Sequence, residues 1–249
     1  MIRCLMALGG NVGPVEQTFH SAIESLTQLS RLNVLTVSSF HGTRAVGSQA
    51  GNDFLNAALL AETSLEPLDL LDELQRIELA LGRIRDTHWG PRTCDLDLIC
   101  YGETRLQSSR LTIPHPACWY RRFVLDPVVE IAADFIHPEK GMSFQQLRNR
   151  LLVRPLPVVI AHNDPHQQQE LIAAIQRRHS HQVCLQTLSS VNAEQLQPAL
   201  FFRVGRPFGT EEFANQQSDD LLSRLVEIQS AELPQQIEDI STVIQAALG

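Results

Sequence analysis

The chain has 249 residues, 43% of them hydrophobic and 19% charged, which is typical of a globular protein with one large or two modest domains. No apolar stretch approaches the roughly 20 residues that cross a bilayer, and residues 1–5 pass directly into an expected strand rather than a secretory leader. The five cysteines are scattered and form no CxxC pair. This pattern favours free thiols in a reducing cytoplasm and argues against a disulfide framework or a zinc site. The net charge of −8 argues against a general nucleic-acid-binding protein.

Hydrophobic periodicity in the first half of the chain predicts strands and helices in a β-α-β-β-α-β order. The strands are expected at 2–8, 32–40, 54–63 and 95–101, and the helices at 14–30 and 66–81. Polar, glycine-containing loops are expected at 41–52 and 82–91. This order predicts an α+β fold with a ferredoxin-like core, in which an antiparallel sheet lies under two helices.

The second half has a different pattern, which begins near residues 153–157. Strands at 158–161, 183–188 and 199–204 alternate with helices at 164–178, at 211–230 and near the C-terminus, which predicts a small parallel α/β domain. We therefore expect one domain at 1–154 and a second at 155–249. Residues 163–166 open a helix where an anion can bind, but the chain lacks the P-loop pattern. His179 and His181 are better explained as a solvated helix end than as metal ligands.

A basic, glycine-containing loop at 88–94 leads directly into an apolar run that carries Asp95 and Asp97. Side chains alternate along a strand, so both carboxylates point to one face with their Cα atoms roughly 6.5–7 Å apart. Carboxylates in this arrangement can hold Mg²⁺, or a pair of such ions. Arg92 is close enough in sequence to meet phosphate oxygens on those ions. The pattern favours phosphoryl transfer; the alternative is a solvated Asp-x-Asp on an edge strand.

Several segments, taken in their order along the chain, resemble the 6-hydroxymethyl-7,8-dihydropterin pyrophosphokinase family of the folate pathway. The resemblance covers about residues 1–150, and nothing comparable is recognisable in the last hundred residues. It implies the same α+β fold, with additional elements over about residues 105–150. Besides 88–99, the segments that carry it are 7–13, 37–40 with Thr43, 53–58, 74–78, 82–85, 110–115 and 121–125.

The implied reaction moves the β,γ-pyrophosphoryl group of ATP to the hydroxymethyl oxygen of the dihydropterin and releases AMP. Asp95 and Asp97 would hold two Mg²⁺ that bridge the triphosphate and lower the pKa of the attacking hydroxyl. Attack would fall on the β-phosphorus, and Asp97 is also a candidate base. The implied catalytic residues are Arg83, Arg92, Asp95 and Asp97.

The resemblance also implies a set of ATP contacts, in which arginine forks match phosphate oxygens. The alternatives are an unremarkable surface cation for each arginine, a core position for the histidine and an exposed helix face for Gln75 and Glu78. The implied ATP contacts are Gln75, Glu78, Arg85, Trp89, Arg92, Arg110, Thr112, His115 and Arg121.

A pterin is flat and lined with donors and acceptors, so it needs aromatic faces and an amide that both gives and accepts hydrogen bonds. By the resemblance, Phe54 and Phe123 are the stacking aromatics and Asn56 is the amide, whereas each alone would read as core. Backbone groups of Thr43 and Val46 are expected to complete the contacts with the polar edge of the pterin.

Several positions depart from the family pattern. Arg44 and Ala45 stand where prolines are frequent, which predicts a less rigid pterin loop. His88 replaces a frequent basic residue, Pro116 replaces an aromatic, and the loop between Arg85 and Trp89 is one residue short.

Two rival hypotheses stay open. One is a catalytically silent nucleotide or pterin sensor that acts through residues 155–249, and the other is an enzyme of the same fold with a different hydroxymethyl heterocycle. The second domain itself is expected to mediate dimerisation or regulation, or to be the remnant of a fused enzyme.

Overall fold

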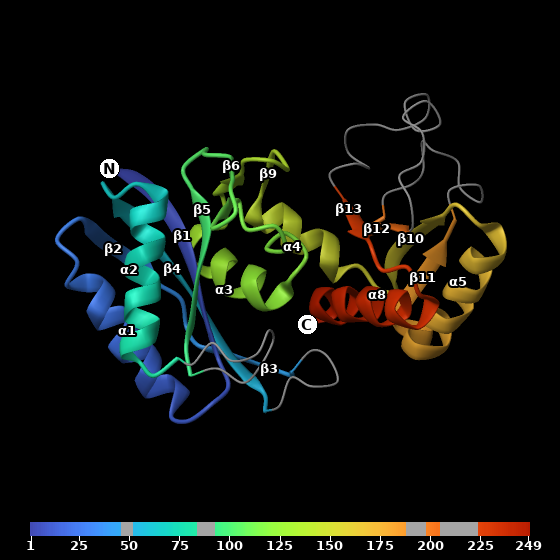
Figure 1. The fold of residues 1–249 in the computed structure, drawn as a ribbon, viewed down its shortest axis with the longest axis horizontal. Coiled ribbons are helices and arrows are strands. Elements are labelled where there is room, and N and C mark those ends of the chain that lie inside the picture. The colour runs from blue at the N-terminus through green and yellow to red at the C-terminus, as the bar shows by residue number, and fades with distance from the viewer. Residues whose placement is uncertain (46–51, 84–92, 188–197, 205–223) are drawn as a thin grey trace. The chain divides into compact units, whose positions relative to one another are not determined.

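A computed structural model describes residues 1–45, 52–83, 93–187, 198–204 and 224–249. The chain divides into two compact units, residues 1–148 with Gly249 and residues 149–248. The boundary expected after residue 154 lies beyond helix α4 (Phe144–Leu152), whereas the units divide within that helix. Each unit is described by itself below (Figure 1).

The main sheet of the first unit has the order β2-β4-β1-β5, with the short β3 added beside β4. Every neighbouring pair along this path is antiparallel. Its strands are β1 (Ile2–Gly10), β2 (Leu32–Val37), β4 (Phe54–Thr63) and β5 (Asp95–Tyr101). Helix α1 (Val15–Thr27) connects β1 to β2, and α2 (Pro67–Ala80) connects β4 to β5. Mixed helix and antiparallel sheet in this order agree with the predicted pattern.

One part of the sequence prediction needs correction in this unit. Residues 41–52 were expected to form a loop, but His41–Thr43 form strand β3. The strand is antiparallel to β4, and Thr43 lies opposite Phe54. Hydrogen bonds to β4 stabilise as a strand a three-residue polar segment that would not form one on its own.

In the first unit, helices pack on both faces of the sheet. Helices α1 and α2 cover one face, where Phe19 and Leu74 pack with Leu96 and Leu98 in the main core. Helix α3 (Arg122–Ala132) packs against β4 and β1 from the other side, as Figure 1 shows. Position along β5 therefore decides whether a side chain enters the main core or faces away from it.

Further small elements complete the first unit after β5, where the family resemblance implies additions. Strand β6 (Leu106–Gln107) pairs with β7 (Thr112–Ile113), and β8 (Ile136–His137) pairs with β9 (Met142–Ser143). All five cysteines of the chain are free thiols. Among the described residues, no helix is both long and apolar enough to cross a membrane.

The second unit is built on a parallel sheet of order β11-β10-β12-β13. The strands are β10 (Leu156–His162), β11 (Val183–Gln186), β12 (Leu200–Val204) and β13 (Leu225–Ile228). Helices α5 (Pro165–His179) and α8 (Leu233–Leu248) pack against each other, and a 3₁₀ turn, η1 (Ser180–Gln182), follows α5.

Two expectations for the second unit are wrong. Residues 225–228 were placed in a helix at 211–230, but they form β13, because the apolar Leu-Val-Glu-Ile run pairs with β12; residues 211–223 lie outside the described part of the chain. His179 is only 3% exposed and is therefore not part of a solvated helix end, whereas His181 is exposed.

Candidate active site

The site lies on the sheet face that points away from the main core, at the end of β1 that carries Gly9. In the antiparallel register, Gly9 lies opposite Asn56 on β4 and opposite Asp95 on β5. Directly opposed residues of antiparallel strands share a face, so Asn56 and Asp95 flank Gly9 in one row. A Cβ atom on Gly9 would lie 3.6 Å from Asn56 Oδ1, an ordinary van der Waals contact, so this position is directly beside the amide.

The next row of the same face runs through Ala58, Ala7 and Asp97. Together with Gly9, these two alanines form a strip of small residues between the polar side chains. Both alanines are buried, and helix α3 packs against the strands that carry them. The two rows thus place one amide and two carboxylates beside a strip of small residues.

Strand β5 alternates as its sequence predicts. Leu96 and Leu98 are buried in the main core, whereas Asp95 and Asp97 are partly exposed on the opposite face. The competing interpretation, an Asp-x-Asp on a fully solvated edge, does not describe Asp95, whose side chain is 16% exposed and ion-paired.

Arg83 bridges two carboxylates just beyond the end of α2. Its Nη1 atom lies 2.5 Å from Asp95 Oδ1 and also contacts Glu78 Oε1. The side chains of Arg83 and Glu78 are 15% and 2% exposed. A guanidinium held between two carboxylates at this depth makes charge-assisted contacts with both of them.

Glu78 is buried within this arrangement rather than exposed on a helix face. Its Oε1 atom also accepts a 2.7 Å hydrogen bond from the backbone N–H of Leu96. Leu96 stands between the two aspartates in β5, so Glu78 fixes both the strand that carries them and the arginine that contacts them. An exposed helix face, the alternative interpretation of Glu78, is excluded by this burial.

The amide of Asn56 is held by strand β3. Asn56 is 5% exposed, and its Nδ2 atom donates a 2.7 Å hydrogen bond to Thr43 Oγ1. Thr43 lies opposite Phe54, the partly exposed residue that begins β4. Thr43, Phe54 and Asn56 are therefore brought together, with Asn56 oriented by a side-chain contact.

His115 and the start of α3 supply the remaining partly buried groups. Burial, and after it the charge of Arg121, lower the pKa of His115 to about 4, while Asp95 opposes this shift. The imidazole is thus neutral at neutral pH, and because Nδ1 accepts the Ala117 N–H, its hydrogen is assigned to Nε2. The Arg121 guanidinium lies 5.6 Å from the centre of the Phe123 ring.

A comparison with protein families gives a match over residues 5–133 to the 7,8-dihydro-6-hydroxymethylpterin-pyrophosphokinase family. The chain belongs to this pyrophosphokinase family. The match lies entirely within the first compact unit and includes β1, β4, β5 and the start of α3, which carry the site.

Named relatives agree with the family. The chain is similar to the 2-amino-4-hydroxy-6-hydroxymethyldihydropteridine pyrophosphokinase of Haemophilus influenzae, with 48% identity over 139 residues, 55% of this chain and 86% of the relative. It is also similar to the protein of that name from Synechocystis, with 45% identity over 143 residues, 57% of this chain and 73% of the relative. The bifunctional protein FolKE of Lactococcus lactis subsp. cremoris is 40% identical over 129 residues, 52% of this chain and 37% of that protein.

Other residues expected in this pyrophosphokinase site have different surroundings. Arg110 is exposed and contacts Asp72 of α2, Thr112 is partly buried on β7, and Gln75 is partly exposed on α2. The structure assigns none of the three a contact with the rows around Gly9. Val46, Arg85, Trp89 and Arg92 lie outside the described residues, as does His88.

The donor set of the site fits a hard divalent cation. Asp95 and Asp97 offer carboxylate oxygens on one face, which Mg²⁺ prefers. Among the described residues, this site included, no cluster of three or more His, Cys, Asp or Glu side chains is placed to hold a metal. Asp95 and Asp97 are therefore the residues that would hold such a cation in this site.

Sequence reasoning missed one group of polar residues beside the site. Ser39 and His41, around the start of β3, contact Glu130 of α3. The family pattern includes residues 37–40, but no sequence signal links them to Glu130, about ninety positions later.

Proposed function

We propose that this chain transfers the β,γ-pyrophosphoryl group of ATP to the hydroxymethyl group of 6-hydroxymethyl-7,8-dihydropterin, which gives the pterin diphosphate and AMP. The observation that carries the proposal is the row Asn56–Gly9–Asp95. Two strand spacings separate its ends, about 10 Å. That distance suits a pterin ring read at Asn56 with its hydroxymethyl arm directed towards Asp95.

Asp95 and Asp97 would hold Mg²⁺, and we infer two ions by analogy with other phosphoryl transfers. When bound, the metal neutralises the triphosphate and lowers the pKa of the attacking hydroxyl. Arg83 contacts Asp95 in the present structure. With ATP bound, the Arg83 guanidinium would turn from Asp95 to the phosphates, where its fork matches the developing negative charge.

We assign ATP contacts to the cationic and neutral donors near this face. Arg121 provides a fixed positive charge, and His115, neutral by its lowered pKa, provides an Nε2–H hydrogen bond rather than a charge. The remaining expected contacts keep their roles as proposals: Gln75, Glu78, Arg85, Trp89, Arg92, Arg110 and Thr112. Among these, Glu78 would act through Arg83, because its own carboxylate is buried.

The pterin would lie beside Gly9, between Asn56 and Asp95. Phe54 and Phe123 would stack on its faces, Asn56 would read its amide edge and the Thr43 and Val46 backbones would complete that edge. The Thr43 contact fixes the Asn56 side chain before any ligand arrives. An amide held in one orientation disfavours a heterocycle with the wrong donor pattern, because the buried polar atoms of the amide would then lack hydrogen-bond partners.

Release of AMP tests the proposal. Wild-type protein with ATP, Mg²⁺ and 6-hydroxymethyl-7,8-dihydropterin is expected to form AMP and pterin diphosphate in equal amounts, with none formed without the pterin. Binding of both ligands without AMP formation would favour the silent sensor. A faster reaction with another hydroxymethyl heterocycle would favour the second rival hypothesis, an enzyme of the same fold with a different substrate.

We further infer that the first unit is a ferredoxin-like core and the second a small α/β domain, which the sheet orders support. Homodimerisation through residues 155–249 stays a prediction.

A further inference from the structure

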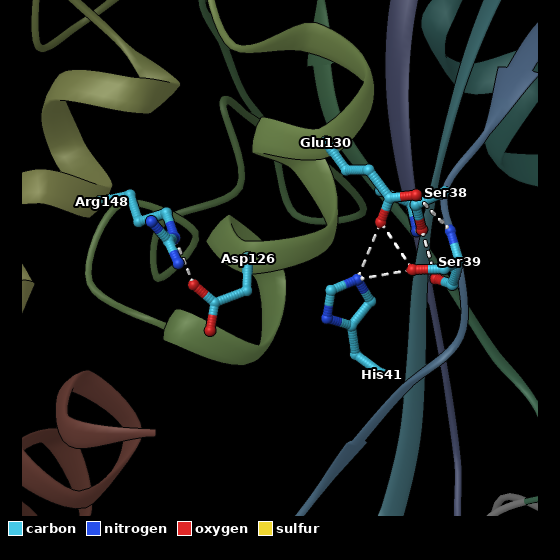
Figure 2. A network of polar contacts seen from close by, with 7 residues as sticks. Ser38, Ser39, His41, Asp126, Glu130 and Arg148 are labelled. Carbon is cyan, nitrogen blue, oxygen red and sulfur yellow. Dashed lines mark hydrogen bonds and ion pairs between the residues drawn. The ribbon is translucent and has the colours of Figure 1, made fainter.

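A compact polar network joins strand β3 to helix α3, and Figure 2 shows it in close view. Ser39 Oγ donates a 2.7 Å hydrogen bond to Glu130 Oε2, and the backbone N–H of Ser39 donates one of 2.8 Å to Oε1. His41 Nε2 lies 3.0 Å from Glu130 Oε2 and 3.2 Å from Ser39 Oγ. Both oxygens of one carboxylate are thus engaged by two residues of a single segment.

The same segment is hydrogen-bonded to strand β4. Ser38 is 6% exposed; its backbone N–H donates to the Ala58 carbonyl at 2.9 Å, and its hydroxyl accepts from the Ala58 N–H at 2.9 Å. Ala58 lies in the row that contains Ala7 and Asp97. Residues 38–41 therefore connect β4 on one side with α3 on the other.

A hydrolytic triad does not explain these three residues. In a triad, one imidazole nitrogen accepts from the serine while the other donates to the acid. Here a single nitrogen, Nε2, faces both Ser39 and Glu130, and Ser39 itself donates to the acid. The serine hydroxyl is hydrogen-bonded directly to the carboxylate, which suits a structural contact between two elements rather than a nucleophile.

The two elements that the network joins carry the proposed pterin contacts. Strand β3 continues from His41 to Thr43, which orients Asn56. Helix α3 begins beside Phe123, and Glu130 follows it by seven residues, two helical turns along the same stripe. A displacement between β3 and α3 would change the gap between the amide and one aromatic face.

We propose that the contact of Ser39 and His41 with Glu130 sets the distance between β3 and α3, which makes these three residues positioning residues for the pterin. The proposal rests on the proposed function, because it assigns the pterin to Asn56 and Phe123. Hydrogen bonds from His41 and Ser39 also lower the pKa of Glu130 to about 2, so this carboxylate is ionised throughout the neutral range.

Pterin binding and steady-state kinetics test this role together. Binding of 6-hydroxymethylpterin is followed by quenching of its fluorescence, at saturating Mg²⁺ and α,β-methylene-ATP. For His41→Phe and for Glu130→Ala, we expect the pterin Kd and KM to rise about tenfold, within the range of coupling between contacting residues. The kcat and the ATP KM should change less than threefold, because the network does not contact β5. The double variant should be no worse than either single one.

Matched variants separate positioning from a general loss of structure. Asp126 lies one turn before Glu130 on α3 and contacts Arg148 at 2.5 Å instead of β3, as Figure 2 shows. Asp126→Asn should leave the pterin Kd unchanged, and His41→Gln, whose amide can still donate to Glu130, should restore it to within threefold. Side-chain exposures of 30% for His41 and 41% for Glu130 leave no buried charge after substitution, so the variants should fold.

The outcomes separate the two proposals. If the wild-type protein binds no pterin, the proposed function fails. If it binds pterin and His41→Phe, Glu130→Ala and Ser39→Ala bind equally well, the positioning role is refuted. Additive effects of His41→Phe and Glu130→Ala would also overturn it, because the two residues would then act independently.

Discussion

Replacement of Asp97 by Ala is expected to lower turnover at least about a thousandfold, which corresponds to about 4 kcal/mol in the activation barrier. Asp97 and Asp95 lie on one face of β5, so the loss of either would remove one of the two carboxylates that we propose hold Mg²⁺. Initial rates of AMP formation at saturating ATP, Mg²⁺ and dihydropterin measure the effect. The fold should survive, because Asp97 is partly exposed and outside the main core.

A control on the same sheet makes this comparison specific. Glu62 lies on β4 opposite Arg3, with an exposed ion pair of 3.5 Å at the end of the sheet away from Gly9. Glu62→Ala removes a carboxylate from the same sheet and should keep turnover within twofold. A loss of less than tenfold in Asp97→Ala would contradict the metal assignment.

Replacement of Glu78 by Ala should produce the largest loss of stability. The variant leaves Arg83 without its most buried partner and the Leu96 N–H without an acceptor. Removal of one member of a buried pair typically lowers the free energy of unfolding by about 3–5 kcal/mol. Urea denaturation, with the midpoint and slope compared to wild type, measures the difference.

Glu73 offers the matched control for this experiment. It lies on α2 five residues before Glu78 and pairs with Arg76 at 2.6 Å, but the two side chains are 33% and 64% exposed. An exposed pair of this kind contributes about 0.5 kcal/mol or less. Equal losses in Glu73→Ala and Glu78→Ala would mean that burial of Glu78 does not stabilise the fold.

Much of the first unit can be predicted from local sequence pattern. Apolar periodicity marks α1 and α2, and alternation in β5 places Leu96 in the core and Asp95 on the other face. These features depend on neighbours a few residues apart. Strand β3 could not be predicted in the same way, because three polar residues become a strand only by pairing with β4.

Long-range contacts account for what sequence reasoning missed in the site. The family pattern indicated Glu78 as a nucleotide contact and Arg83 as a catalytic residue, yet only the fold shows that Glu78 accepts the Leu96 N–H inside the protein. Likewise, His41 and Glu130 are 89 residues apart and share no motif. Contacts of this kind depend on how helices pack on the sheet, which periodicity along one element does not encode.

The second unit shows the same limit at the level of whole elements. Its alternation of strands and helices predicts a parallel sheet, and β10 pairs in parallel with β11 and β12. Residues 225–228 were nonetheless assigned to a helix, because Leu-Val-Glu-Ile is too short to distinguish a buried strand from part of a helix by pattern alone.

The position of Mg²⁺ in a crystal of the protein with α,β-methylene-ATP and 6-hydroxymethylpterin tests the central claim most directly. We predict that oxygens of Asp95 and Asp97 each lie about 2.0–2.1 Å from Mg²⁺, that Arg83 has left Asp95 for the phosphates, and that Asn56 contacts the pterin. A nucleotide bound with Mg²⁺ away from both aspartates, and with Arg83 still paired to Asp95, would contradict it.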